Sequence, residues 1–223
     1  DSLYHSPTDM GVNMAGFATV DDEICRAAAR QEIIRRYYKA ACDYKTGNCG
    51  QDTVERILLL MNQNKISQEE RSVVRHALEK AEKTGSSAVA VELSDGRTVT
   101  GRSSKLMSAC SSAVLNAVKA LSNIDDEMLL LSPIILAPII RLKKEVLGED
   151  KVKLSLGDVL TALSICAATN PIAEKALDML VSLRGCEAHA SCILPESDMS
   201  VVRKLGINLT CEPEFGSKDL YGF

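Results

Sequence analysis

The chain has 223 residues and a mass of 24.1 kDa, of which 46% are hydrophobic and 25% charged. This is an ordinary globular composition, with enough apolar residues for one large core or two small ones. The net charge of -4 and the pI near 5.5 argue against a general attraction to nucleic acid or anionic lipid. Aromatic residues make up only 4% and tryptophan is absent, which disfavours base stacking. We therefore expect neither nucleic acid nor a membrane as a partner.

The cysteines and the start of the sequence are those expected of a cytoplasmic protein. We expect the eight cysteines to be reduced, because most lie in apolar periodic segments and a chain of this length needs no disulfides. No leader of the secretory type opens the sequence. The apolar run 128–140 is too short to span a bilayer and contains two prolines. We expect this run to be buried, in the fold or in an interface between copies of the chain.

Residues 1–20 are expected to form a structured lead-in loop. Glycine, proline and small polar residues alternate in the segment Ser6-Pro7-Thr8-Asp9-Met10-Gly11-Val12-Asn13. Side chains of this kind hydrogen-bond either to nearby backbone or to a ligand. Two interpretations stay open: the loop caps the following helix, or it binds a ligand through Thr8, Asp9 and Asn13.

Residues 21–85 are predicted to form a helical subdomain. Asp21 and Asp22 supply a cap and negative charge for a first helix that runs to about residue 42. A second helix is expected at about 52–61, and a third opens with a capping box formed by Ser67 and Glu70. Each helix has a single apolar stripe, so the three must pack on one another or on a neighbouring element.

Residues 86–223 are predicted to form a small α/β domain. The segment 88–101 is typical of a β-hairpin, with Asp95 and Gly96 at its turn. A helix that carries the apolar residues Ala113, Val114, Ala117, Val118 and Leu121 follows. Pro133 begins another helix, which Pro138 should bend or break. Further helices are expected at 155–168 and 171–185.

The last part of the sequence alternates between strand and helix. Segments 186–194 and 207–211 are predicted strands, and the helix 196–205 between them completes a βαβ unit. The predicted fold class is therefore mixed α/β (α+β): a small mixed sheet covered by helices in three layers. The order of elements is similar to the cytidine-deaminase-like architecture, although the zinc motif of that architecture is missing.

The segment Cys186-Glu187-Ala188-His189-Ala190-Ser191-Cys192 is the strongest candidate for chemistry. On an extended strand the two thiols point to one face and His189 to the other, so no metal site is expected. Glu187 and His189 share a face, where the carboxylate would favour a charged imidazole and the two would form an acid–base pair. The alternative is an ion-paired histidine with a purely structural role.

The first predicted helix carries an unusual number of basic residues. If it faces another domain, Arg35 and Arg36 are suited to bind phosphate oxygens; otherwise they face water. The sequence contains no H-E-x-x-H helix, no G-x-S-x-G elbow, no Walker loop and no dinucleotide-binding glycine pattern.

Several long segments together identify a family resemblance. They are the loop motif above, Gly185-Cys186-Glu187-Ala188-His189 and Leu205-Gly206-Ile207-Asn208-Leu209-Thr210. Over nearly its whole length the chain resembles the C-terminal part of a bacterial protein family defined as a conserved domain of unknown function. The resemblance implies a longer protein, whose upstream domain carries a glycine-rich phosphate loop. Members of the family were once considered ATP-dependent zinc proteases, but these residues contain no corresponding ligand motif.

We therefore expect a C-terminal module that completes a ligand cleft with a separate N-terminal domain and also mediates self-association. The ligand implied by the resemblance is a nucleotide or phosphate bound in the full-length protein, with no cofactor held by this chain alone. The alternative is an enzyme acting on a phosphorylated small molecule, with Glu187 and His189 as the acid–base pair and Arg35 or Arg36 holding phosphate. A scaffold that self-associates through 129–140 is a third hypothesis.

Overall fold

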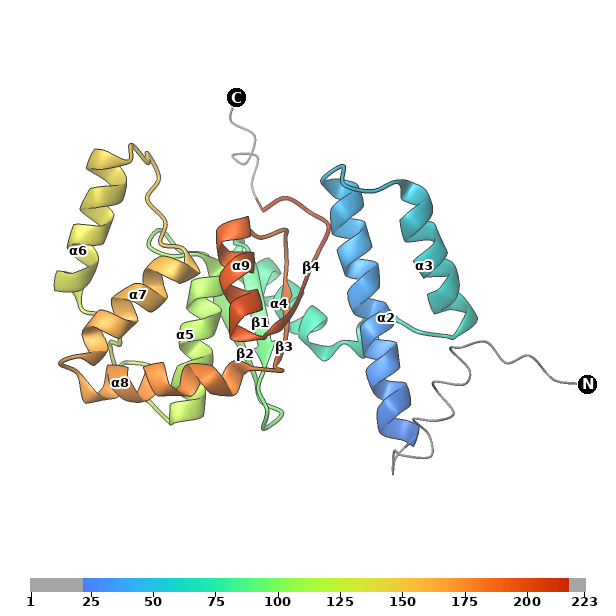
Figure 1. Ribbon diagram of the computed structural model, residues 1–223, viewed down its shortest axis with the longest axis horizontal. Helices are drawn as coiled ribbons and strands as arrows, with labels where there is room; N and C mark the ends of the chain where they lie inside the picture. Colours follow the sequence, from blue (N-terminus) through green and yellow to red (C-terminus); the bar gives the residue numbers. More distant parts are fainter. Residues whose placement is uncertain (1–21, 217–223) are drawn as a thin grey trace, which may run out of the picture.

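The computed structural model describes residues 22–216, in which two N-terminal helices precede a four-stranded sheet packed with helices (Figure 1). The predicted lead-in loop, with Thr8, Asp9 and Asn13, lies outside the described residues. This part of the chain contains eight α-helices and four strands. Their bounds are α2 (Asp22–Lys45), α3 (Gln51–Gln63), α4 (Ser72–Thr84), β1 (Ala88–Glu92), β2 (Thr98–Arg102), α5 (Ala109–Ser122), α6 (Pro133–Arg141), α7 (Leu156–Ala167), α8 (Pro171–Asp178), β3 (Glu187–Ala190), α9 (Glu196–Leu205) and β4 (Asn208–Cys211).

Helices α2 and α3 form an antiparallel pair at one end of the molecule (Figure 1). Ile34 and Tyr38 of α2 pack against Met61 of α3 and against Ile66, which follows it. The chain reverses after α2 at Gly47, whose φ of 79° lies in the left-handed region that glycine adopts without strain. The predicted first two helices are therefore present, each slightly longer than its apolar stripe indicated.

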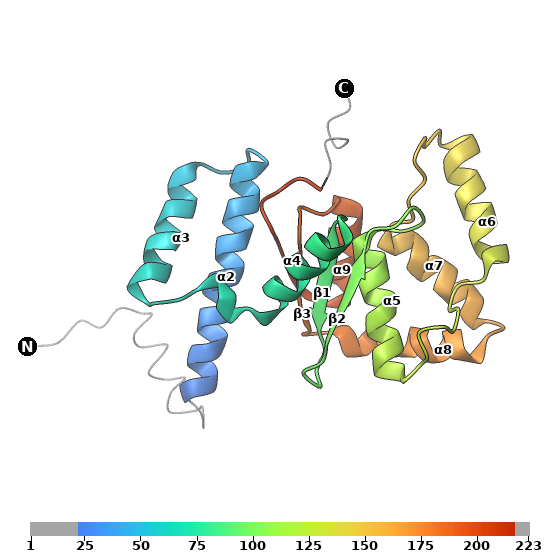
Figure 2. The same ribbon diagram turned by 180° about the vertical axis from the view of Figure 1, so that it is seen from behind.

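The third predicted helix packs on the sheet. The capping box of Ser67 and Glu70 is present, but it opens a short 3-10 turn, η1 (Gln68–Glu70), rather than the helix itself. Helix α4 begins two residues later, and its Val73 and Ala77 contact Ala90 of β1. Seen from behind, α4 crosses in front of β1 (Figure 2). One face of the sheet is therefore covered by α4.

The sheet has the strand order β2-β1-β3-β4, with β1 antiparallel to both of its neighbours and β3 parallel to β4. The predicted hairpin is confirmed, and Gly96 at its turn has a φ of 81°. The predicted βαβ unit is formed by β3, α9 and β4. Strand β3 ends at Ala190, well before residue 194, because neither neighbouring strand extends further along it. The antiparallel strand β1 begins at Ala88, and the parallel strand β4 ends at Cys211.

The main core lies on the face of the sheet opposite α4. Val89 and Val91 of β1 and Ala188 of β3 pack there against residues of α5, α7, α8 and α9. Helix α5 approaches β2 very closely at Gly101, where an added Cβ would lie 2.1 Å from the backbone nitrogen of Ala113. Only glycine allows this contact.

The apolar run 128–140 is only partly buried. Leu130, Leu131 and Leu136 belong to the core, whereas Leu129 and Ile134 are largely exposed, so burial within the fold holds for only part of the run. Helix α6 also continues through Pro138 and changes to π-helical geometry only at η2 (Leu142–Val146). A proline removes a single backbone bond, and here that loss does not end the helix.

The helix predicted at 171–185 is shorter in the structure. Helix α8 ends at Asp178, and a 3-10 segment, η3 (Met179–Leu183), fills the remainder of the predicted helix. No helix within residues 22–216 has the length and apolar character needed to cross a bilayer.

We predict that Gly101→Ala lowers the free energy of unfolding by about 1–3 kcal/mol, because the new methyl group must push α5 away from β2. Gly157→Ala on α7 is the matched control: its nearest atoms lie 3.8 Å from the added Cβ, and alanine is the better helix former. Urea denaturation of both variants checks this. Equal stability of the two would contradict the close contact.

Candidate functional site

The side chain of Arg71 is the largest fully buried one in the described chain, with 2% of the residue exposed. It extends from the N-cap of α4 across the ends of β3 and β4. Its Nε donates to Thr210 Oγ1 at 2.9 Å, and its Nη2 donates to the carbonyl oxygens of Ala188 at 2.8 Å and Asn208 at 2.7 Å. Its Nη1 pairs with the carboxylate of Glu187. The guanidinium therefore joins α4 to both parallel strands.

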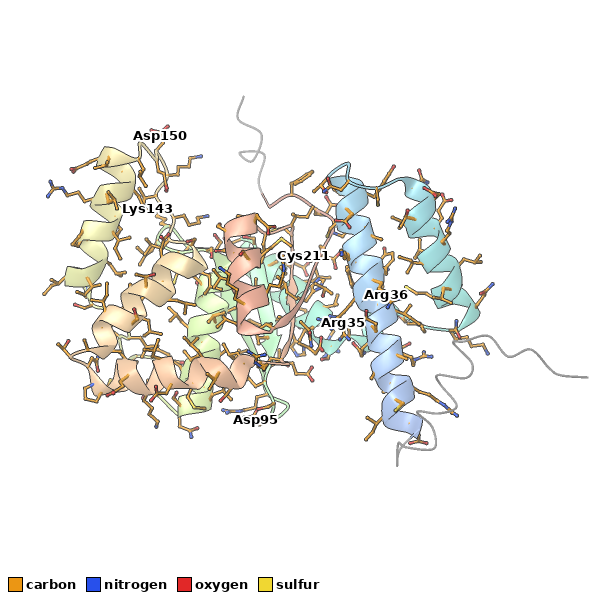
Figure 3. The ribbon with its side chains drawn as sticks, in the orientation of Figure 1. Arg35, Arg36, Asp95, Lys143, Asp150 and Cys211 are labelled. Atoms are coloured by element: carbon orange, nitrogen blue, oxygen red, sulfur yellow. The ribbon has the colours of Figure 1, made fainter. Side chains whose placement is uncertain are left out.

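Glu187 extends this connection to α2. Arg35 Nη1 donates to Glu187 Oε1 at 2.9 Å, and Asn208 Nδ2 donates to the same oxygen at 2.9 Å. Arg35 also pairs with Glu32 on its own helix at 3.0 Å. In Figure 3, Arg35 lies between α2 and the strands. Both oxygens of Glu187 are therefore occupied by partners within the chain.

His189 is completely buried, with an exposed fraction of 0%. Its Nδ1 lies 2.8 Å from Thr210 Oγ1, its Nε2 lies 3.1 Å from Glu212 Oε1, and the Tyr38 ring packs edge-on at 4.8 Å between centroids. Burial lowers the pKa of His189, against the opposing influence of Glu212. With a neutral ring, the Thr210 hydroxyl accepts from Arg71 and donates to Nδ1, while Nε2–H donates to Glu212.

The structure places Glu187 and His189 on the same side of β3, as strand alternation predicts, but gives them different partners. The carboxylate beside the imidazole is Glu212, and no hydrogen bond joins Glu187 to His189 among the described contacts. A substrate would reach His189 only if Tyr38 or Glu212 moved. This arrangement is typical of a structural network, and the acid–base role of the pair stays a hypothesis.

We predict that Arg71→Met lowers the free energy of unfolding by about 3–5 kcal/mol, because it removes the charged donor to Glu187 Oε2 and to the carbonyl oxygens of Ala188 and Asn208. Arg75→Met is the control: Arg75 is largely exposed, pairs only with Glu79 on the same helix, and should change stability by at most about 1 kcal/mol. Chemical denaturation measures both. A loss for Arg71→Met no larger than that of the control would contradict the network.

Arg35 and Arg36 do come together, in a groove of about 610 Å³ between α2, α9 and β4. The charges lining this groove are mixed: the cations are Arg35, Arg36, Lys39 and Arg203, and the acids are Glu32, Asp43 and Glu196. Arg36 also pairs with Glu32, at 3.1 Å. A phosphate would have to displace these carboxylates, so the groove is a weak anion site.

A larger hollow of about 790 Å³ lies where β2 and β3 end and where α5 and α9 begin. We call it the serine cleft. It is defined by five serines (Ser86, Ser87, Ser103, Ser104 and Ser108), four cations (Arg102, Lys105, Lys151 and Lys153) and one carboxylate (Asp198). Ligands of α/β proteins commonly bind outside the carboxyl ends of strands, which is the place of this cleft.

The electrostatics of the serine cleft favour an anion. Its lining has four cations and one acid, although the whole chain has a net charge of -4. Within the described residues, Arg102, Lys105 and Lys153 take part in no salt bridge, and Lys153 Nζ donates to Ser103 Oγ at 2.8 Å. Helix α5 starts at the cleft, with Ser108 as its N-cap, and adds the positive end of its dipole.

Sequence reasoning missed the serine cleft because its residues come from four separate segments. Residues 83–87 had the composition of a linker, and no spacing connects them with 102–105, 151–153 or 192–198. The available signal was Arg102-Ser103-Ser104-Lys105, a basic and hydroxyl-rich stretch between a strand and a helix.

The described residues were also compared with the requirements of a metal site and of a reactive thiol. No three His, Cys, Asp or Glu side chains in residues 22–216 gather so that they could hold a metal ion. The eight cysteines are free thiols, and burial raises the pKa of Cys211 to about 12.

The fold is that of a mixed α/β protein in which N-terminal helices precede a sheet of four strands. The family model described as "Domain of unknown function DUF1846, C-terminal" matches residues 69–221, and its counterpart described as "N-terminal" matches residues 1–65. The chain therefore belongs to the DUF1846 family, which confirms the resemblance found in the sequence.

Curated relatives agree with this assignment. The chain is 49% identical to a UPF0371 protein of Clostridium botulinum (strain Kyoto / Type A2) and 47% identical to one of Clostridioides difficile (strain 630), each over 229 residues. Both alignments cover 99% of this chain and 46% of the relative. The chain thus spans about half the length of these proteins.

The two family models meet between residues 65 and 69, close to η1. Helices α2 and α3 fall on one side of this division, and α4 with the sheet on the other. The contacts of Arg35 with Glu187 and of Tyr38 with His189 cross it. The buried polar network is therefore a junction between the two matched regions.

Proposed function

We propose that this chain supplies a binding site for a phosphorylated small molecule and that the serine cleft is this site. The observation that carries the proposal is the excess of cations over acids in the cleft, combined with five serine hydroxyls. Guanidinium and ammonium groups form charge-assisted hydrogen bonds with phosphate oxygens, and hydroxyls and helix N-termini add neutral donors. The groove between α2, α9 and β4, which we call the α2 groove, has no comparable excess of positive charge.

The size of the cleft agrees with a small organic ligand. Its volume of about 790 Å³ falls in the usual range for such sites, roughly 300–1,000 Å³. A nucleotide or a sugar phosphate is the class of ligand that fits both this size and this charge. The proposal thus retains the expected nucleotide or phosphate ligand but assigns it to other residues than Arg35 and Arg36.

The rest of the longer protein enters the proposal as a partner. The relatives extend well beyond the matched region, and we propose that an additional N-terminal domain completes the ligand cleft, while the contacts to the phosphate come from this chain alone. The three-layer, cytidine-deaminase-like layout expected from the order of elements belongs to this proposal as well, since it would place ligands at the strand ends. It implies no zinc chemistry.

We predict that replacing Lys105 and Lys153 together with alanine weakens binding of pyrophosphate at least tenfold. Two charge-assisted contacts are lost, and loss of only about 1.4 kcal/mol corresponds to this factor. The control is Arg36→Ala with Lys39→Ala, which removes the same charge from the α2 groove. Calorimetry with the 223-residue chain measures both double variants. Weaker binding in the control alone would move the site to the α2 groove and refute the proposal.

A second candidate function is self-association through the outer end of the molecule. Helix α6 lies far from the α2–α3 pair (Figure 1). Together with its flanking segments it exposes several large apolar side chains: Leu129, Ile134, Leu142, Val146 and Leu147. Large exposed apolar side chains are common at interaction sites, and we propose that a second copy of the chain covers these.

We predict that the chain sediments as a dimer and that Ile134→Glu converts it to a monomer, because a charge would be buried in the interface. Val181→Glu is the control, since Val181 is equally exposed (79% against 81%) but lies on η3. A wild-type chain that stays monomeric at high concentration would refute self-association and leave this surface to the remainder of the longer protein.

A further inference from the structure

Asp198 is the single carboxylate of the serine cleft, and it is almost fully buried, with 1% of the residue exposed. It lies in the first turn of α9. Its Oδ1 accepts a hydrogen bond of 2.7 Å from the backbone nitrogen of Leu156, the first residue of α7. Its Oδ2 is equally buried but has no hydrogen-bond partner among residues 22–216.

A buried acceptor without a partner needs an explanation. Removing a carboxylate oxygen from water is unfavourable unless a donor replaces the water. The contrast with Glu187 is informative, because both oxygens of that half-buried carboxylate are occupied by donors from Arg71, Arg35 and Asn208. Since Oδ1 is fixed by the start of α7, the carboxylate is held in place with one oxygen free for a further donor.

The dianion that dominates for a phosphate ester at neutral pH has no proton to donate, and its oxygens would repel the carboxylate. We infer that Asp198 Oδ2 accepts a hydrogen bond from a hydroxyl group of the same ligand whose phosphate the cations of the serine cleft bind. This inference rests on the proposed function and narrows it to a phosphorylated sugar or polyol, the sugar of a nucleotide included. A site built around a buried acceptor rejects analogues that lack the matching donor.

The test compares two phosphate esters that differ in their hydroxyl groups, ribose 5-phosphate and pentyl phosphate. Calorimetry with the wild-type chain should show at least tenfold tighter binding of ribose 5-phosphate. In Asp198→Asn, which keeps the shape and the oxygen that faces Leu156, this preference should fall to less than threefold. Pentyl phosphate should bind Asp198→Asn as well as or better than wild type, since a negative charge has left the cleft. The control, Asp178→Asn, changes an exposed carboxylate on α8 and should keep the full preference.

The possible outcomes distinguish the role of Asp198 from the existence of the phosphate site. If neither ester binds the wild-type chain, the phosphate site itself is refuted, and the role of Asp198 with it. If both bind equally and both are weakened by loss of Lys105 and Lys153, the site stands and the role of Asp198 is refuted. A preference that disappears when EDTA is added would assign Oδ2 to a metal ion, and would also overturn the inference. If Asp198→Asn fails to fold, the wild-type comparison decides alone.

Discussion

The structure depends on one buried guanidinium. Arg71 stands where α4 begins and donates to two strands and a carboxylate, and that carboxylate in turn binds Arg35 of α2. A buried charge is tolerated only when its donors are matched in this way, so the elements around it have little freedom to shift. The same contacts cross the division between the two matched family regions. The relative position of α2 and the sheet is thus fixed by these polar contacts, together with the packing of Tyr38 on His189 and of Cys42 on the main core.

This arrangement separates polar residues that stabilise the fold from polar residues that remain available to a ligand. Around Arg71, donors and acceptors satisfy one another, and His189 is inaccessible behind Tyr38. At the strand ends, Arg102, Lys105 and Lys153 take part in no salt bridge within residues 22–216, and Asp198 Oδ2 has no hydrogen-bond partner there. A shifted pKa does not by itself mark a functional group, because the lowered pKa of His189 results from burial. The two regions differ more clearly in whether their polar groups have hydrogen-bond partners within the chain.

The sequence predicted local features of the fold well, but it did not indicate the serine cleft. The hairpin around Gly96 and the βαβ unit followed from turn chemistry and alternation, because both are local signals. The end of β3 did not, since it depends on where β1 and β4 stop. The burial of Arg71 could not be predicted either, because in the sequence it is one of several basic residues next to a helix. Likewise the serine cleft requires segments from both sides of the chain's midpoint to meet, and no motif records that meeting.

We propose that ligands bind in the serine cleft and not at the network around Arg71. An NMR titration of the isotope-labelled chain with ribose 5-phosphate tests it most directly, since backbone amide shifts locate the ligand without assuming a reaction. We expect saturable shifts centred on the segments 102–108 and 192–198, with Glu187 and His189 unaffected. Shifts centred on Arg35, Arg36 and β4 would contradict it.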